Sequence, residues 1–555
     1  MIKKLKKAFT ITELVIVIAV IAILAAVLIP TFTSLINKAN QSSDQSAVRN
    51  MNLALQNAEA EGRPSGVAEA LEVLNEYGMD AQQYKALASG RKFVYSVNEN
   101  RVLYVTDDYM IEYPEEYAGK YYDESIYAAA ITLELQILPD DSWMENKQVG
   151  DSNDVANFGS SSGTGILKDN TGKLLAAKVA QPGQLVSVMD YISENTHDPT
   201  STNADTEFKD FTLFLSADIN LGGAEVRSIK YYDGNFDGNE HTISGIKMSD
   251  ATQQSYQTEG GSANYYTYFG FISIFAGETF KDVTLEVDID FPGIAGKGAT
   301  VSSSWNNHTV GGAIGGIFSK GGTLNTTVSN VTVNGSIVSH SRIGGIVGYV
   351  GGAKGSENHA NGSVTIANCY NNADIKSAIS EAAGFSAAGG IVGNTNSVSS
   401  GFTLTISNCE NTGSVTAAHA AGIFSRAYQA GIITISNCTN EGNIYGLINE
   451  KVTAPDNSGD NYVTASGIFS DAVQESVQVT ISGCYNLGTI SYVREDNSSE
   501  ARSVQLANMY ANPDCSGLQG SVILGEGNGT SKDGKSGTLV DAGSAGVTVT
   551  KREMA

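Results

Sequence analysis

Asn408-Cys409-Glu410-Asn411-Thr412-Gly413-Ser414-Val415 is one copy of a motif that recurs along the second half of the chain. Other copies begin at Asn330, Asn368, Asn437 and Gly483. A second motif, Gly-Ile followed by Phe or Val, alternates with it at 316–318, 345–347, 390–392, 422–424 and 467–469. Copies lie roughly 30–45 residues apart, which suits one coil of a solenoid whose like side chains stack about 4.8 Å apart. The repeats therefore predict a mostly β fold, a right-handed parallel β-helix.

The composition agrees with a chain of many short strands. The 555 residues include 60 Gly and only 9 Pro, and Gly and Asn permit the turns that strands need between them. The length suits roughly three domains. The formal net charge of −25 would repel phosphate backbones, and no basic stripe offsets it. We therefore expect no binding of nucleic acid.

Segments upstream of the repeats belong to the same pattern. They lie at 211–213, 217–221, 236–246 and 268–272. Together with the two motifs, these segments resemble the coils of bacterial surface proteins that carry the GLUG repeat. The resemblance spans roughly residues 208–492. It implies the solenoid fold and extracellular adhesion, and it brings no catalytic residue with it, because solenoids host adhesins and polysaccharide-cleaving enzymes alike.

Four cysteines, Cys369, Cys409, Cys438 and Cys484, fill the same slot of successive repeats. A disulfide ladder is conceivable in an exported protein. However, stacked residues lie about 4.8 Å apart, which is wider than the Cβ separation of about 3.8 Å in a disulfide. We therefore predict an inward-facing core ladder of free thiols. No Cys-x-x-Cys pair or nearby His accompanies them, so we expect neither a metal nor a cofactor.

The N-terminus carries a concentrated basic segment followed by an apolar one. Lys3, Lys4, Lys6 and Lys7 precede an uncharged stretch at 14–37. About two dozen helical residues at about 1.5 Å each are enough to cross a hydrocarbon core of about 30 Å. The lysines should remain on the cytoplasmic side. This pattern predicts a long N-terminal transmembrane helix.

The stretch Lys7-Ala8-Phe9-Thr10-Ile11-Thr12-Glu13-Leu14, with Pro30 downstream, resembles the N-terminal signature of type IV prepilins and pseudopilins. The resemblance implies cleavage between Ala8 and Phe9 by a membrane aspartyl peptidase, followed by methylation of Phe9. It also implies that Glu13 meets the N-terminal amine of a neighbouring subunit. The family usually has Gly before the cut, so Ala8 departs from its pattern.

The residues themselves leave alternatives at two of these positions. A carboxylate at the edge of an apolar span needs a partner, so Glu13 either snorkels to water or makes the assembly contact. Pro30 either ends the helix or kinks it. The combination of Phe9, the basic leader and Pro30 favours the assembly role.

The chain is expected to divide into seven parts. Val48, Met51, Leu55 and Ala58 share one helical face, and the β-rich runs 92–96 and 101–105 form a hairpin. The expected parts are a prepilin leader at 1–8, a transmembrane and polymerisation helix at 9–60, a small α+β pilin-like head at 61–117, a linker or adapter at 118–177, a helical cap at 178–207, a β-solenoid at 208–500 and a C-terminal cap or tail at 501–555.

Catalysis is not predicted. The six histidines are scattered, and Asp233 and Asp237 near Lys230 are better explained by a turn between coils. Binding is favoured instead. Insertions at 351–362, 376–387, 449–462 and 494–502 are expected to protrude as loops. The tyrosines at positions 231, 232, 255, 265, 266 and 268 either stack on sugars or cap the first coils, and the second interpretation is preferred.

These features predict a type IV pilin-like surface protein that displays a solenoid for adhesion. A head of this size would crowd a fibre, so a minor or tip pilin is favoured. The expected partners are the prepilin peptidase, other pilin subunits, the membrane and a surface glycan or a ligand on a host or partner cell. The precursor would cross the inner membrane once and then join a cell-surface filament. The alternatives are a pseudopilin of a secretion or DNA-uptake system and a membrane-anchored polysaccharide-active enzyme.

Overall fold

The computed structural model separates the chain into two compact units. The first comprises Met1–Ala128 and Thr132–Leu138, and the second Ala129–Ile131 and Pro139–Ala555. The structure describes residues 11–62, 70, 73–74, 76–78, 86–96, 100–106, 110–116, 118, 129–131, 135–137, 147–149, 158, 165–169, 173–195, 208–223, 226–249, 257–260, 264–291, 307–319, 322–339, 341–352, 359–378, 386–428, 431–449, 462–474, 476–495, 502–511, 521–544 and 547–553. Within 11–35 it describes the backbone alone.

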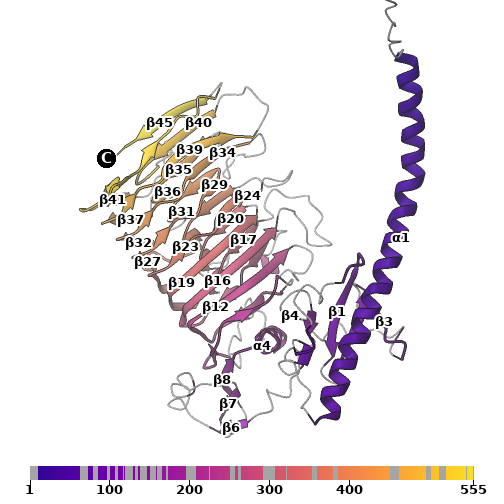
Figure 1. Ribbon diagram of the computed structural model, residues 1–555. Coiled ribbons are helices and arrows are strands. Elements are labelled where there is room, and N and C mark those ends of the chain that lie inside the picture. The colour runs from indigo at the N-terminus through magenta and orange to yellow at the C-terminus, as the bar shows by residue number, and fades with distance from the viewer. Residues whose placement is uncertain are drawn as a thin grey trace, which may run out of the picture. The chain divides into compact units, whose positions relative to one another are not determined.

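The first unit joins one long helix to a small sheet (Figure 1). The helix α1 (Ile11–Ala60) is followed by β1 (Arg91–Ser96), β2 (Arg101–Thr106), β3 (Ile111–Tyr113) and β5 (Leu135–Ile137). The strands β1 and β2 form the predicted antiparallel hairpin, β3 pairs antiparallel with β2, and β5 pairs parallel with β1.

The C-terminal half of α1 packs on this sheet through its apolar stripe. Val48, Met51, Leu55 and Ala58 are buried, as their spacing of three and four residues predicts, while Leu53 on the other side of the helix is exposed. The helix contacts β2, whose Val102, Leu103, Tyr104 and Val105 are fully buried. The periodicity of the sequence therefore determines which side chains of α1 are buried in the core of the first unit.

The second unit is mostly β, and its strands form parallel sheets in which each coil of the chain adds strands beside those of the previous coil (Figure 1). This is the arrangement of a β-solenoid. We call its three sheets the long sheet, the second sheet and the third sheet. The long sheet contains β6 (Lys147–Val149), β7 (Gly165–Lys168), β8 (Leu174–Val179), β9 (Thr212–Leu215), β10 (Ile219–Asn220), β12 (Asn235–Ser249), β16 (Thr279–Phe291), β19 (Thr323–Ser339), β22 (Asn361–Ala367), β23 (Tyr370–Asn371), β24 (Asp374–Ser377), β27 (Thr403–Ser407), β28 (Glu410–Asn411), β29 (Val415–Ala417), β32 (Gly431–Ser436), β33 (Thr439–Asn440), β34 (Ile444–Ile448), β37 (Val477–Ser482), β38 (Tyr485–Asn486), β39 (Thr489–Arg494), β41 (Ser521–Leu524) and β44 (Thr538–Leu539).

The other two sheets complete each coil. The second sheet contains β11 (Ile229–Tyr232), β15 (Ile272–Phe275), β18 (Ile314–Ser319), β21 (Val347–Gly352), β26 (Val392–Asn396), β31 (Phe424–Ala427) and β36 (Phe469–Ala472). The third sheet contains β13 (Gln257–Gly260), β14 (Asn264–Phe269), β17 (Asn307–Gly311), β20 (Ser341–Gly344), β25 (Ser386–Gly389), β30 (His419–Ala421), β35 (Tyr462–Ser466), β40 (Arg502–Ala507) and β45 (Val547–Arg552). The remaining elements of this unit are β4 (Ala129–Ile131), α4 (Pro182–Asn195), which packs on β11, and the hairpin of β42 (Ser531–Lys532) and β43 (Lys535–Ser536).

The first residue of the octapeptide occupies a corner of the long sheet. Asn330, Asn368, Asn408 and Asn437 have φ of 53–54°, and Gly483 has φ of 63° in the same place of its coil. This left-handed region is sparsely populated except by Gly and by Asn or Asp, so the residue type follows from the backbone. The motif recurs because each coil turns the same corner.

The two motifs touch each other inside the coil. A Cβ added to Gly422 of a Gly-Ile-Phe motif would lie 2.4 Å from Cγ of Asn440, and one added to Gly390 would lie 2.4 Å from Cγ of Asn411. Only a glycine leaves room for the buried amide. The co-occurrence of the two motifs is thus a packing requirement.

The sheets continue at both ends beyond the expected solenoid limits of 208 and 500. The strand β8 pairs parallel with β9, and β40, β41 and β45 add parallel strands after residue 500. The described residues of 501–555 therefore include strands that extend these sheets. Gly and Ser are abundant there, but short edge strands tolerate them because the preceding coil supplies the hydrogen-bonding partners.

Candidate functional site

The predicted processing site and its neighbours lie mostly outside the described residues. Ala8 and Phe9 are outside them, and for Glu13 and Pro30 only the backbone is described. That backbone is helical throughout α1, so the helix does not end at Pro30. Among the described residues, no helix combines the length and hydropathy that a membrane crossing requires.

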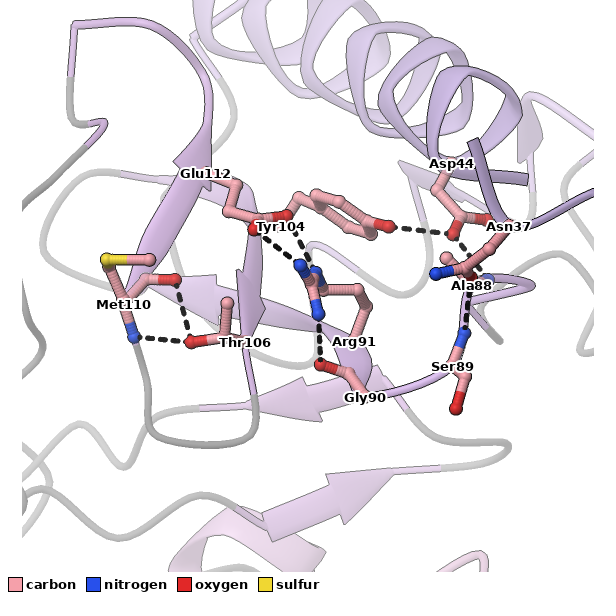
Figure 2. A network of polar contacts seen from close by, with 10 residues as sticks. All are labelled: Asn37, Asp44, Ala88, Ser89, Gly90, Arg91, Tyr104, Thr106, Met110 and Glu112. Atoms are coloured by element: carbon pink, nitrogen blue, oxygen red, sulfur yellow. Dashed lines mark hydrogen bonds and ion pairs between the residues drawn. The ribbon is translucent and has the colours of Figure 1, made fainter. Parts of the chain in front are cut away.

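The contacts that fix α1 to its sheet centre on a buried carboxylate (Figure 2). Asp44 accepts hydrogen bonds from the backbone N–H of Leu87 at 2.8 Å and of Ala88 at 2.9 Å, and from the hydroxyl of Tyr104 at 3.1 Å. Two turns earlier, Asn37 accepts from the N–H of Ser89 at 3.1 Å. Because charged acceptors make the stronger hydrogen bonds, Asp44 holds the loop before β1 against the helix.

A second buried side chain, further along α1, also bonds the helix to the sheet. The side-chain amide of buried Asn52 donates to the carbonyl of Val102 at 2.9 Å and accepts from its N–H at 2.7 Å, as a neighbouring strand would. Burial, reinforced by the charge of Asp44, raises the pKa of Tyr104, so its hydroxyl remains a donor at physiological pH. These bonds position the helix rather than a substrate.

An ion pair on the same sheet completes the network of Figure 2. The guanidinium of Arg91 binds Glu112 through two contacts of 2.8 Å, from Nε to Oε2 and from Nη2 to Oε1. The two parallel bonds fix β1 relative to β3 with more geometric precision than a single contact would. Both side chains are partly exposed, so the pair adds little stability and mainly orients the strands.

The four repeat cysteines are buried and free, and they lie on the inner side of the long sheet. Each thiol lies 3.2–3.4 Å from the carbonyl oxygen two residues earlier in its own coil. Burial raises the pKa of Cys369 and of Cys438, whereas hydrogen bonds with neighbouring thiols outweigh burial and lower the pKa of Cys409 and of Cys484. Cys369 and Cys438 therefore stay protonated, and a protonated thiol is a poor nucleophile and metal ligand. No cluster of metal-binding side chains is found in the described ranges.

The tyrosines considered as a sugar-binding patch divide into two groups. Tyr231, Tyr232 and Tyr268 are buried in the core of the first coils, with at most 6% exposure. The ring of Tyr268 packs against Phe318 and Tyr349. These three therefore have the packing role that was preferred for them. The side chains of the others, at 255, 265 and 266, lie outside the described residues, as does half or more of each predicted insertion loop.

Of the carboxylates considered for catalysis, Asp237 lies within β12, just before a register shift between this strand and β16. Asp237 accepts a hydrogen bond from the N–H of Asn239, which has φ of 50°. Its salt-bridge partner is Lys281 of the next coil, at 2.8 Å, and Lys281 also binds Asp282 at 2.7 Å.

On each sheet, residues that lie in register from coil to coil form a column. Two columns, one on the second sheet and one on the third, face each other in the interior, and we call the buried contact between them the seam. The second-sheet column runs in register from Tyr231 through Ile274, Gly316, Tyr349, Asn394 and Arg426 to Asp471. In its later coils the seam holds a buried ion pair, Arg426 to Asp471 at 2.9 Å. On the third sheet, buried His419 contacts Oγ1 of Thr464 at 3.0 Å. Burial and the nearby Arg426 charge keep the pKa of His419 well below its ordinary value, so the imidazole is neutral.

The outer face of the long sheet carries a feature that the sequence analysis missed. Threonines occupy one register position in successive coils, and we call them the threonine column: Thr279, Thr327, Thr365, Thr405, Thr434 and Thr480. Two residues further along each strand, a parallel column holds Ser329, Ala367, Ser407, Ser436 and Ser482. A sequence signal existed, because a threonine stands three residues before each corner residue of the octapeptide.

This face is uncharged from β19 to β41. None of its outward side chains is ionisable among the described residues: Thr323, Asn325, Thr327, Ser329, Asn361, Ser363, Thr365, Ala367, Thr403, Thr405, Ser407, Ile432, Thr434, Ser436, Gln478, Thr480, Ser482, Ser521 and Ile523. On a chain of net charge −25 that absence is unusual. We call this surface the neutral face.

Comparison with family models and with curated proteins gives no match. Among solved structures, a chain described as a "putative immunoglobulin A1 protease" from Bacteroides ovatus aligns with a TM-score of 0.37 and 15% identity. The alignment covers 65% of this chain and 86% of the other. A likeness at this level carries no argument about fold or activity.

Proposed function

We propose that this chain is a type IV pilin-like surface protein, processed by the prepilin peptidase and assembled through α1, which displays its solenoid for adhesion. The proposal is carried by one helix. The prepilin-like stretch at 7–14 leads into a helix of 50 residues whose later turns are bonded to a small sheet through Asp44 and Asn52. A pilin needs this combination, because the helix must join the filament while its own head stays attached.

In the proposed mechanism the peptidase cuts between Ala8 and Phe9, and Phe9 is methylated. The apolar part of α1 first crosses the inner membrane and then leaves it to pack among other pilin subunits. Glu13 meets the amine of a neighbouring Phe9, because a carboxylate surrounded by apolar side chains is stable only when it is paired. Pro30 softens the helix within the filament.

The attachment of α1 to the sheet has a mechanical consequence in this scheme. Pulling on the helix acts on the bonds from Asp44 to Leu87 and Ala88 and from Asn52 to Val102. These contacts lie over the last third of α1 and are reinforced by the buried Val48 and Met51. The head is therefore expected to stay folded while the helix is extracted from the bilayer.

The solenoid, which we take to be right-handed, would face outward from the filament. Its size favours a minor or tip pilin over the main structural subunit, since a subunit of 555 residues at every position would crowd a fibre. Adhesion to a surface glycan or to a ligand on a host or partner cell follows as the role of the displayed head.

Mass spectrometry of the N-terminal peptide from filaments sheared off native cells tests the proposal. We expect a peptide that begins at Phe9 and carries one added methyl group. Glu13→Gln should leave processing intact and remove the protein from the filaments, whereas Glu59→Gln, a matched change at a partly exposed position of the same helix, should not. Retention of residues 1–8 in a protein confined to the membrane would refute the pilin mechanism.

A further inference from the structure

The neutral face has the regularity of a lattice. Neighbouring parallel strands lie about 4.8 Å apart, so the hydroxyls of Thr365, Thr405, Thr434 and Thr480 recur at that interval along the solenoid. In the adjacent column, Ser407, Ser436 and Ser482 repeat the interval about 7 Å away, two residues along each strand. Rigid coils hold this spacing, because each strand is hydrogen-bonded on both sides.

These hydroxyl groups are available to an external partner. In the described part of the chain, the side chains of Thr365, Thr405, Thr434 and Thr480 take no part in intramolecular hydrogen bonds, and all four are partly exposed. By contrast, Thr412 on the neighbouring strip of the same sheet donates to Asn372 at 2.6 Å. These four members of the threonine column therefore present free donors and acceptors in a fixed row.

The neutral face also presents apolar groups. Ile432 and Ile523 lie among the hydroxyls and are 44% and 58% exposed, although large apolar side chains are normally buried. Each threonine adds a methyl group beside its hydroxyl. A sugar has the same mixture, since hydroxyls project from a ring whose faces are formed by C–H groups.

Charge narrows the choice of partner. An anionic polymer would be repelled by a chain of net charge −25, and a cationic one would bind the acidic remainder of the surface in preference to this face. A protein partner is disfavoured as well, because stable protein interfaces concentrate Tyr, Trp, Arg and Met, and none of these occurs on the neutral face. A neutral polymer is the remaining match.

We propose that the neutral face binds an extended, neutral, β-linked polysaccharide whose sugar units follow the threonine column. The interval of about 4.8 Å is close to the length of one sugar in an extended chain, so each coil can offer the same contact to successive units. Single contacts of this kind are weak, and their repetition along one rigid surface provides the affinity. The inference deepens the proposed adhesive function, on which it rests, by naming the face and the class of ligand.

Retention of the full-length protein, purified in mild detergent, on insoluble cellulose, chitin and mannan tests the inference, with polygalacturonate as the anionic control. The quadruple variant T365V/T405V/T434V/T480V keeps side-chain shape and strand preference while removing the hydroxyls. We expect the wild type to be retained on at least one neutral polymer and the variant to bind it at least tenfold more weakly. Thr434→Glu, which places a charge in the centre of the face, should have a similar effect.

The matched control is T284V/T332V/T416V/T439V, which removes four partly exposed threonine hydroxyls of the long sheet beyond the corner residues. It should bind like the wild type. The inference fails if the wild type binds no neutral polymer, if it prefers polygalacturonate, or if both quadruple variants lose binding equally. Binding is measured without filaments, so processing at Phe9 without polysaccharide binding would overturn this inference alone, and binding without processing would overturn the pilin proposal alone.

Discussion

The early and late coils of the solenoid share one backbone arrangement and differ in what fills it. In one buried column of the long sheet, Ile243, Leu285 and Val333 are followed in register by Asn371 and by further asparagines. The seam between the second and third sheets changes at the same height. Its early part holds a cluster of Tyr231, Tyr268, Ile274, Phe318 and Tyr349, and its later part holds Asn394, His419, Arg426 and Asp471.

The buried asparagines of the late coils satisfy their hydrogen-bonding groups by bonding to one another from coil to coil. The side-chain amide of Asn371 donates to Asn411, Asn411 to Asn440, and Asn440 to Asn486, each at 2.8 Å. A buried amide costs free energy unless it is hydrogen-bonded, and an in-register neighbour is the partner that removes this cost. Apolar side chains stack in any register. The asparagine ladder therefore specifies the register of the late coils, which the early coils leave to shape complementarity.

The largest expected effect is in the polar part of the seam. Asp471→Ala leaves the guanidinium of Arg426 as an uncompensated buried charge, so we expect a loss of about 3–5 kcal/mol in the free energy of unfolding. Thermal and denaturant unfolding followed by circular dichroism measures this. The double variant R426M/D471L, which imitates the early coils, should recover most of the loss. If the double variant is as unstable as D471A, late coils cannot adopt an apolar seam.

The asparagine ladder should come next. Asn440→Ala removes the acceptor of Asn411 and the donor to Asn486 inside the core, which should cost about 2–3 kcal/mol. Asn440→Val places an early-coil residue at this position. It still leaves the amides of Asn411 and Asn486 without their hydrogen-bonding partner, so it should recover little of the lost stability. The comparison is measured by unfolding of both variants. A stable N440V would show that the ladder is dispensable for the late coils.

The sequence allowed the repeat and the hairpin of the first unit to be predicted, because each depends on local spacing. The seam could not be predicted. Arg426 and Asp471 belong to different coils, and charged residues are almost always exposed, so nothing local indicates that they meet inside. The Asp44 contacts were missed for the same reason, since Leu87 and Ala88 are distant in sequence. The threonine column was predictable from its fixed offset to Asn368, Asn408 and Asn437.

Acid should lower stability through the late part of the seam, which contains His419, and not through its early part. The pKa of buried His419 is lowered in the folded state, so below the unfolded value of about 6.5 the unfolded chain binds a proton that the folded chain excludes. The contribution of His419 to stability should therefore be constant above about pH 6.5 and fall by about 1.4 kcal/mol per unit below it. The lowered pKa values of Asp218, Asp282 and Asp541 act only near and below pH 4.

His419→Gln is the control for the acid effect. It keeps a polar side chain beside Thr464 without a titrating group, so the slope between pH 5 and 6.5 should flatten. Unfolding midpoints measured across this range test it. An unchanged slope in H419Q would assign the acid sensitivity to groups outside the seam.

The smallest effect is expected where the two parts of the seam adjoin. The single hydroxyl proton of Tyr349 is shared between the carbonyl oxygens of Gly352 and Asn396, at 2.8 and 2.9 Å, so this tyrosine combines an early-coil ring with a late-coil hydrogen bond. Tyr349→Phe keeps the ring contact with Tyr268 and removes only the hydroxyl, which should cost about 0.5–1.5 kcal/mol. A loss as large as that of D471A would mean that hydrogen bonding also governs the aromatic part, and the contrast between early and late coils would then be one of residue type alone.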